Sequence, residues 1–272
     1  MSYKSEIYSG EPIIVEGTEG AAQTPEGLSK GLEKRDLEAD PIGGFSERFS
    51  LPTIPRSEWD DRVEQMEKTK SRLSDLSYSA NLKCLDQNGT NYCWANGPVY
   101  CVQVVRVSMG VGVEYLSPAS VAAPIKNYKN QGGYGTQALK YITKYGIVPS
   151  KYWPPNAIDE SYYTEENRNL AKDYVVTEWY DLESNNFDQL MTCLLLRIPV
   201  AVGYDWWRHE VSAIDPISFG DGSYGIRIRN SWGMGYGKDG YAILGEKKGT
   251  PDDGVAPRVT VSYKESTIPF QS

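Results

Sequence analysis

The 272-residue chain contains one histidine, no long hydrophobic run and no cluster of basic residues. Its 28 lysine and arginine residues face 36 acidic ones, and the net charge of −8 offers nucleic-acid phosphates no general attraction. We therefore expect no nucleic-acid partner. No apolar stretch approaches the roughly 20 residues that cross a bilayer, so no membrane partner is expected either. A single imidazole leaves little for a zinc site, and we expect no metal and no cofactor.

The four cysteines, at positions 84, 93, 101 and 193, show no C-x-x-C spacing. They fit a reducing setting in which they remain thiols, and three of them, Cys84, Cys101 and Cys193, are expected to be buried without a function. Residues 1–6 lack the apolar segment of a signal peptide. These features predict an intracellular, cytoplasmic protein or a component of a viral or phage particle.

Composition and periodicity divide the chain into five parts. Residues 1–55 are rich in Gly, Glu, Ser, Thr and Pro without apolar periodicity, which predicts an extended polar arm. Such an arm cannot fold alone, so we expect contacts outside the two lobes that follow to hold it; the alternative is an intramolecular pro-segment that lies on the cleft. The other parts are a helical lead-in at 56–80, a helical lobe at 81–173, a β lobe at 174–263 and a tail at 264–272.

The order of the expected elements gives the fold class. Apolar spacing and capping residues predict helices at 57–76, 93–107, 136–144 and 188–196, with one more opening at Ser117 and Pro118. Two-residue alternation then predicts strands at 198–202, 209–214, 224–230 and 241–244. Helices first and strands second indicate an α+β protein, with a helical lobe packed against an antiparallel sheet lobe.

Cys93 precedes a tryptophan at the expected start of the central helix. The first-turn N–H groups and the helix dipole favour an anion there, so this thiol is placed to ionise. A thiol needs a base, and His209 is the only imidazole in the chain. The Asn230 amide could orient that base, and the Gln87 amide could turn back toward the sulfur. The simpler alternative for Cys93 alone is a structural thiol beside a core tryptophan.

These residues resemble the papain family of cysteine peptidases. The match covers about residues 84–245 and includes the segments Gln87…Cys93-Trp94-Ala95, Leu116-Ser117-Pro118, Gly132-Gly133-Tyr134, His209 and Asn230-Ser231-Trp232-Gly233. The resemblance implies a two-lobed fold with the active cleft between the lobes. By position, Cys93 would be the nucleophile, His209 the acid and base, Asn230 the orienting amide and Gln87 the oxyanion donor.

The same resemblance implies supporting and substrate-binding residues. Trp232, with Trp94, would support the site, and Trp232 would shield the bond between Asn230 and His209 from water. Gly133, with Gly132 and Tyr134, would form the wall along which an extended peptide pairs.

The chain also departs from the family pattern. Thr90-Asn91-Tyr92 stands where Cys-Gly-Ser is usual, so Tyr92 is expected to narrow the cleft. Arg208 precedes the histidine, and alternation along a strand predicts that it points away from the ring and is paired with Glu210. Tyr236 replaces a second tryptophan, and residues 1–80 carry no helical pro-domain signature.

Two classes of function remain open at the level of sequence. One is a peptidase that hydrolyses peptide bonds of a peptide or protein substrate through a thioester on Cys93. Restricted access past Tyr92 predicts that such a peptidase has weak or highly selective activity. The other is a structural or assembly protein, such as a component of a virus or phage shell, that uses the same fold as a module with weak or no peptidase activity. In that case the arm at 1–55 would bind the assembly partner.

Overall fold

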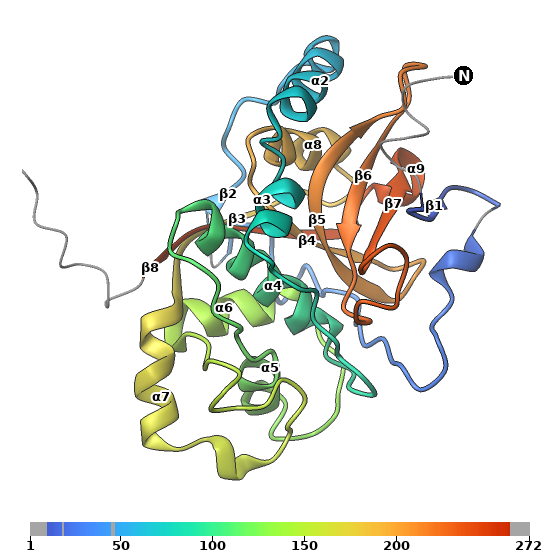
Figure 1. The fold of residues 1–272 in the computed structure, drawn as a ribbon. Coiled ribbons are helices and arrows are strands. Elements are labelled where there is room, and N and C mark those ends of the chain that lie inside the picture. The colour runs from blue at the N-terminus through green and yellow to red at the C-terminus, as the bar shows by residue number, and fades with distance from the viewer. Residues whose placement is uncertain (1–9, 18, 45–46, 262–272) are drawn as a thin grey trace, which may run out of the picture.

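A computed structural model describes residues 10–17, 19–44 and 47–261 of the chain (Figure 1). The tail expected at 264–272 lies outside the described residues. Helices α4 (Cys93–Ser108), α5 (Ala119–Ile125), α6 (Gly135–Tyr145) and α7 (Glu165–Ala171) form a helical lobe. The sheet lobe carries α2 (Trp59–Thr69), α8 (Phe187–Leu195) and the short α9 (Glu246–Gly249), while α3 (Leu73–Ser79) packs against α4. The α+β class with two lobes is therefore confirmed.

One mixed sheet has the strand order β1-β7-β6-β5-β4-β8-β3-β2. Its strands are β1 (Ile13–Ile14), β2 (Glu47–Arg48), β3 (Val175–Asp181), β4 (Val200–Tyr204), β5 (His209–Ser218), β6 (Tyr224–Arg229), β7 (Tyr241–Gly245) and β8 (Asp253–Val261). The central pairs are antiparallel, as expected, but the edge strands β1 and β2 pair in parallel. The sequence gives no alternating signal for either edge strand, because each is two residues long.

Both faces of the central strands are buried, which explains their continuous apolar character. In β4, Val200 and Val202 enter the core under α2 and α8, whereas Ala201 enters the core formed with α4, α5 and α6. The sheet therefore separates two hydrophobic cores.

The central helix α4 begins at Cys93 and includes Pro98, as expected. All residues from 93 to 106 are buried, because the helix packs between the helical lobe and the sheet. The single helix expected at 57–76 is instead broken into α2 and α3, since Lys70 ends α2 in a left-handed conformation with φ of 51°. The apolar stripe expected on it is confirmed, since Trp59, Val63, Met66 and Leu73 are buried.

The described part of the N-terminal arm folds onto the two lobes, and the expectation that outside contacts hold it was wrong. It supplies β1 and β2 to opposite edges of the sheet, and a 3₁₀ turn at Glu19–Ala22 lies between them. Backbone pairing and long-range contacts replace the hydrophobic periodicity that the arm lacks.

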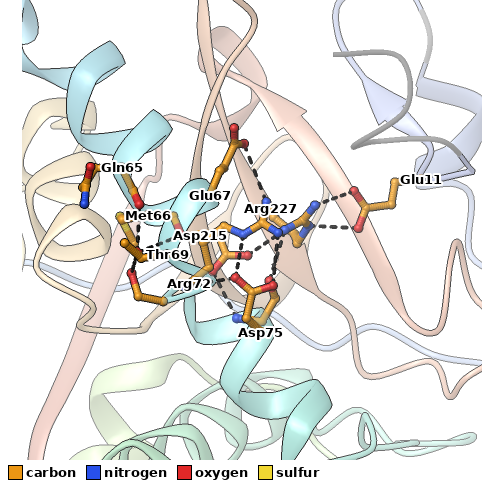
Figure 2. A network of polar contacts seen from close by, with 11 residues as sticks. Glu11, Gln65, Met66, Glu67, Thr69, Arg72, Asp75, Asp215 and Arg227 are labelled. Carbon is orange, nitrogen blue, oxygen red and sulfur yellow. Dashed lines mark hydrogen bonds and ion pairs between the residues drawn. The ribbon is translucent and has the colours of Figure 1, made fainter. Parts of the chain in front are cut away.

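Figure 2 shows one polar anchor of this arm. Arg227 of β6 donates to both carboxylate oxygens of Glu11, at 2.9 and 3.0 Å, and to Asp215 of β5 at 2.8 Å. The side chains of Arg227 and Glu11 are each 6% exposed, so the ion pair is buried and its charges are matched. Neighbouring Arg72 binds Asp75, which brings the start of α3 to the same network.

Within the described ranges, no helix has the length and apolar character needed to cross a membrane.

Candidate active site

His209 and Asn230 meet at the sheet ends that border the helical lobe. Nε2 of His209 lies 2.8 Å from Oδ1 of Asn230, which is an acceptor, so Nε2 carries the proton and Nδ1 is the basic nitrogen. The Trp232 ring stacks on the imidazole with centroids 4.5 Å apart and 19° between the planes. Trp207 contacts the imidazole edge-on at 5.0 Å. Two indoles therefore exclude water from the bond that orients the histidine.

Cys93 is the first residue of α4 and is fully buried. Burial raises the pKa of its thiol well above the usual range, and the nearby charge of Glu210 raises it further. Burial likewise lowers the pKa of His209 to about 3, against the opposing hydrogen bond to Asn230 and with a contribution from the Lys30 ammonium. Among the described residues, Nδ1 of His209 has no hydrogen-bond partner. The thiol and the imidazole are consequently both neutral in this state.

Gln87 is fully buried and its amide is held at both ends. Its Nε2 donates to the Thr90 carbonyl at 2.8 Å and to the Ser29 carbonyl at 2.9 Å. Its Oε1 accepts a hydrogen bond of 2.6 Å from the Ser231 hydroxyl. The amide N–H that would face a developing oxyanion is therefore already occupied by a carbonyl of the N-terminal arm.

Residues 29–35, which we call the strap, lie along this site. The Trp232 indole donates to the Ser29 carbonyl at 3.0 Å. Gly133 N–H donates to the Gly31 carbonyl at 2.9 Å, and Glu33 N–H donates to the Gly133 carbonyl at 2.8 Å, so that Leu32 and Gly133 form a parallel β-bridge. The strap therefore uses the backbone groups of the glycine wall that the resemblance assigns to a peptide.

Glycine is required on both sides of this bridge. A Cβ on Gly133 would stand 2.7 Å from ring atoms of Trp94, so any side chain there would displace the wall. A Cβ on Gly31 would overlap the Asn91 backbone, and its φ of +149° disfavours other residues as well. Gly132 lies beside the strap on the same wall, in a groove of about 540 Å³ that Asn91, Trp206 and Trp207 also line. Trp94 thus supports the wall from beneath.

Tyr92 lies elsewhere than expected. Its side chain is fully buried in the helical-lobe core, where the hydroxyl donates to the Lys129 carbonyl at 2.9 Å and the ring contacts Trp94 edge-on. It does not narrow the cleft, because the chain enters α4 with this side chain turned into the helical lobe. Tyr134 is half-buried at the start of α6, and its pKa is raised by burial and by the charge of Asp40.

Glu210 and Arg208 do not form the expected pair. Arg208 is exposed and has a positive φ of 52°, which takes it out of the strand alternation. Glu210 is 1% exposed, and its carboxyl group faces the backbone N–H of Gly135, the first residue of α6. The other cysteines behave as expected in part, since Cys101 and Cys193 are buried free thiols and Cys84 is a half-buried one.

The sequence did not reveal the strap or the role of Ser231. The strap has no apolar periodicity, and its contacts are made by backbone groups far away in the chain. Ser231 lies inside the Asn-Ser-Trp-Gly segment, and its hydroxyl is the sequence signal for this role, since a buried hydroxyl requires a hydrogen-bond partner.

No family model matches the sequence. Chymopapain of Carica papaya is 24% identical over 205 residues, which cover 68% of this chain and 56% of that protein. The chain thus spans little more than half the length of this curated relative.

Two solved structures have folds similar to that of this chain. The procathepsin L 3 of Tenebrio molitor larval midgut aligns with a TM-score of 0.62 and 19% identity, over 80% of this chain and 75% of that one. Xylellain, a cysteine protease from Xylella fastidiosa, aligns with a TM-score of 0.61 and 18% identity, over 87% of this chain and 98% of that one. The chain therefore has the papain-like fold, and the resemblance seen in its motifs extends to the whole two-lobed architecture.

Proposed function

We propose that this protein is a cysteine peptidase that hydrolyses peptide bonds through a thioester on Cys93. The observation that carries the proposal is the 2.8 Å contact between Nε2 of His209 and Oδ1 of Asn230 under the Trp232 ring. This bond commits one ring nitrogen to Asn230 and leaves Nδ1 as the base. A papain-like fold with Cys93 at the start of α4 supplies the thiol that such a base would serve.

The proposed reaction has two halves, in which Cys93 is first acylated and the thioester is then hydrolysed. Nδ1 of His209 accepts the Cys93 proton, and the thiolate attacks the carbonyl carbon of the peptide bond. The backbone N–H of Cys93 and the Gln87 amide stabilise the oxyanion, and the imidazolium then gives its proton to the leaving amine. Water, deprotonated by His209, attacks the thioester and releases the acid and the thiol.

The state described here is a closed one. The strap occupies the Gln87 N–H and both backbone groups of Gly133, which are the groups that a substrate needs. It also buries the thiol and the imidazole, which favours their neutral forms over the reactive ion pair. The peptidase proposal therefore includes displacement of the strap as a step before substrate binding.

The test is covalent labelling with a peptidyl epoxide, which alkylates an activated thiol. We compare the wild-type chain with Gly31→Ala, in which the new methyl group collides with Asn91 and expels the strap. Gly27→Ala is the matched control, because Gly27 also has a positive φ, of +77°, but a Cβ there meets nothing within 4 Å.

We expect Gly31→Ala to be labelled at Cys93 at least about tenfold faster than wild type and Gly27→Ala. Cys93→Ala in the Gly31→Ala chain should remove both the label and the turnover of activated peptide esters. If the Gly31→Ala chain is neither labelled at Cys93 nor active on any ester, the peptidase proposal fails.

The alternative of an assembly module rested on the N-terminal arm. The described parts of that arm bind the chain's own sheet edges, Arg227 and the cleft, which supports an intramolecular role for them. The peptidase is for this reason the function we put forward.

A further inference from the structure

Three residues stand in a row across the sheet beneath the strap. In the register of β4, Gly203 is directly opposite Glu210 of β5 on one side and Asp253 of β8 on the other. Residues directly opposite one another on neighbouring strands project from the same face of a sheet. Two carboxyl side chains therefore flank a position that has no side chain of its own.

The strap places Leu32 on this bare position. A Cβ on Gly203 would lie 3.2 Å from one Leu32 methyl group and 3.3 Å from the other, so the leucine side chain fills the space that Gly203 leaves. Leu32 is also the residue bridged to Gly133. A peptide that pairs with Gly133 as the strap does would direct one side chain into the same hollow, between Glu210 and Asp253.

Glu210 is buried without a basic or side-chain partner among the described residues. It is 1% exposed, its carboxyl group faces the backbone N–H of Gly135 at the start of α6, and no side-chain donor bonds either oxygen within the described part of the chain. Room for the carboxyl group is kept by two glycines, since a Cβ on Gly135 would lie 2.5 Å from Oε1 and one on Gly97 would lie 3.4 Å from Cγ. Burying a carboxyl group without a cation costs stability, which an apolar residue here would avoid.

The strap itself brings a cation to the other carboxylate. Arg35 donates to Asp253 at 2.9 Å and to Asp181 at 2.7 and 2.8 Å, and its side chain is 3% exposed. A guanidinium is thus the group that this end of the cleft accepts in the closed state. When the strap leaves, Asp181 and Asp253 lose that cation together.

We infer that the hollow beneath Leu32, bounded by Gly135, Gly203, Glu210 and Asp253, binds an arginine or lysine side chain of the peptide substrate. The inference rests on the proposed peptidase function and names its substrate class. Glu210 and Asp253 accept hydrogen bonds from the basic group, while the side-chain methylene groups replace Leu32 against Gly203.

The experiment uses the Gly31→Ala chain and peptidyl epoxides that differ at one residue at a time. Arginine, lysine, norleucine or glutamate is placed in turn at each of the three residues before the reactive group. We expect arginine and lysine to raise the labelling rate at least about tenfold over norleucine at one of these positions, because a buried charge-assisted hydrogen bond is made only there.

Glu210→Gln, which keeps the shape and removes the charge, should bring the ratio of arginine to norleucine down to about one. Asp205→Asn removes a carboxylate at the rim, on the loop between β4 and β5, and should leave the ratio unchanged. If Glu210→Gln does not fold, Asp253→Asn takes its place. A wild-type preference for norleucine at all three positions, or a basic preference that survives both Glu210→Gln and Asp253→Asn, overturns the inference.

A binding measurement separates this inference from the peptidase proposal. Cys93→Ala in the Gly31→Ala chain is titrated with fluorescent peptides that carry arginine or norleucine at the preferred position, or in turn at all three if no epoxide reacts. Tighter binding of the arginine peptide without any labelling of Cys93 in the parent chain leaves the inference standing and the peptidase proposal overturned. Labelling of Cys93 together with equal binding of the two peptides leaves the peptidase proposal standing and overturns the inference.

Discussion

The side chains of Gln87 and Ser231, 144 residues apart in the chain, meet in a 2.6 Å hydrogen bond from the serine hydroxyl to Oε1. The Ser231 N–H also donates to Oδ1 of Asn230 at 2.7 Å, and its carbonyl accepts from the Gln87 N–H at 2.8 Å. Because Oε1 is bound by a donor, the NH₂ end of the Gln87 amide is the end that faces the cleft. One serine therefore fixes two amides of the proposed site.

Replacement of this serine tests its positioning role. In the Gly31→Ala chain, we expect Ser231→Ala to lower kcat on an activated peptide ester by roughly tenfold to a hundredfold, because the Gln87 amide is no longer held toward the oxyanion. KM should change much less. Ser212→Ala is the matched control, since the Ser212 hydroxyl is also buried and donates to a backbone carbonyl, that of Gly97, at 2.9 Å.

Both serine variants lose about 1 kcal/mol of unfolding free energy with one buried hydrogen bond. A purely structural role for Ser231 would lower kcat equally in the two variants. Steady-state kinetics beside urea unfolding of each variant separates the two outcomes.

Much of the fold follows from local sequence signals. Alternation along β6 and the apolar run of α4 each identified an element, because these segments pack against a core at every turn or every second residue. The family resemblance identified both His209 and Asn230, and the fold places the two side chains in contact. The break between α2 and α3 was missed, because it depends on a single left-handed residue, Lys70.

The strap could not be read from sequence for a different reason. Its bridge to Gly133 is a contact between backbone groups about a hundred residues apart, and such contacts leave no side-chain pattern. The direction of Tyr92 was also beyond the sequence, since α4 begins at Cys93 as expected and the place of the ring is set by its contacts with Trp94 and the Lys129 carbonyl in the helical lobe. Position in a motif is set by sequence, but side-chain direction is set by packing.

The burial of Tyr92 leads to a prediction opposite to that of a cleft residue. Tyr92→Ser should lower the unfolding free energy by about 3–5 kcal/mol, because it empties a buried aromatic site beside Trp94. Tyr92→Phe removes only the bond to the Lys129 carbonyl and should cost about 1 kcal/mol. Urea unfolding measures both. Faster ester turnover in Tyr92→Ser, with unchanged stability, would place the ring in the cleft after all.

Because the chain has one histidine, the pKa of His209 can be measured without overlap from another imidazole. Its pKa is lowered to about 3 by burial, so at pH values between about 3 and 6.5 an open or unfolded chain binds a proton that the closed chain does not. The contribution of His209 to closure of the strap is therefore fully present above about pH 6.5 and is lost as the pH falls toward 3. We expect NMR of histidine-labelled protein to show a lowered pKa in wild type that moves back toward 6.5 in Gly31→Ala.

Gly27→Ala serves as the control for this titration and should behave like wild type. A wild-type imidazole that titrates near 6.5 would show that the strap does not exclude water from His209 in solution.

Arg35 should decide whether the strap stays closed. Its guanidinium is matched by Asp181 and Asp253 in a site where its own side chain is 3% exposed, so Arg35→Met leaves two buried carboxylates without their cation, at a cost of about 3–5 kcal/mol. Release of the strap relieves this cost by letting water reach both carboxylates.

We therefore expect thermolysin to cut Arg35→Met within residues 28–37 at least about tenfold faster than wild type, while near-UV circular dichroism of the lobes is retained. Lys34→Met is the matched control, because the Lys34 side chain is 83% exposed and its ion pair with Asp205, at 3.5 Å, lies at the surface. Equal resistance of the two variants would mean that the backbone bridge to Gly133, and not the arginine, holds the strap in the cleft.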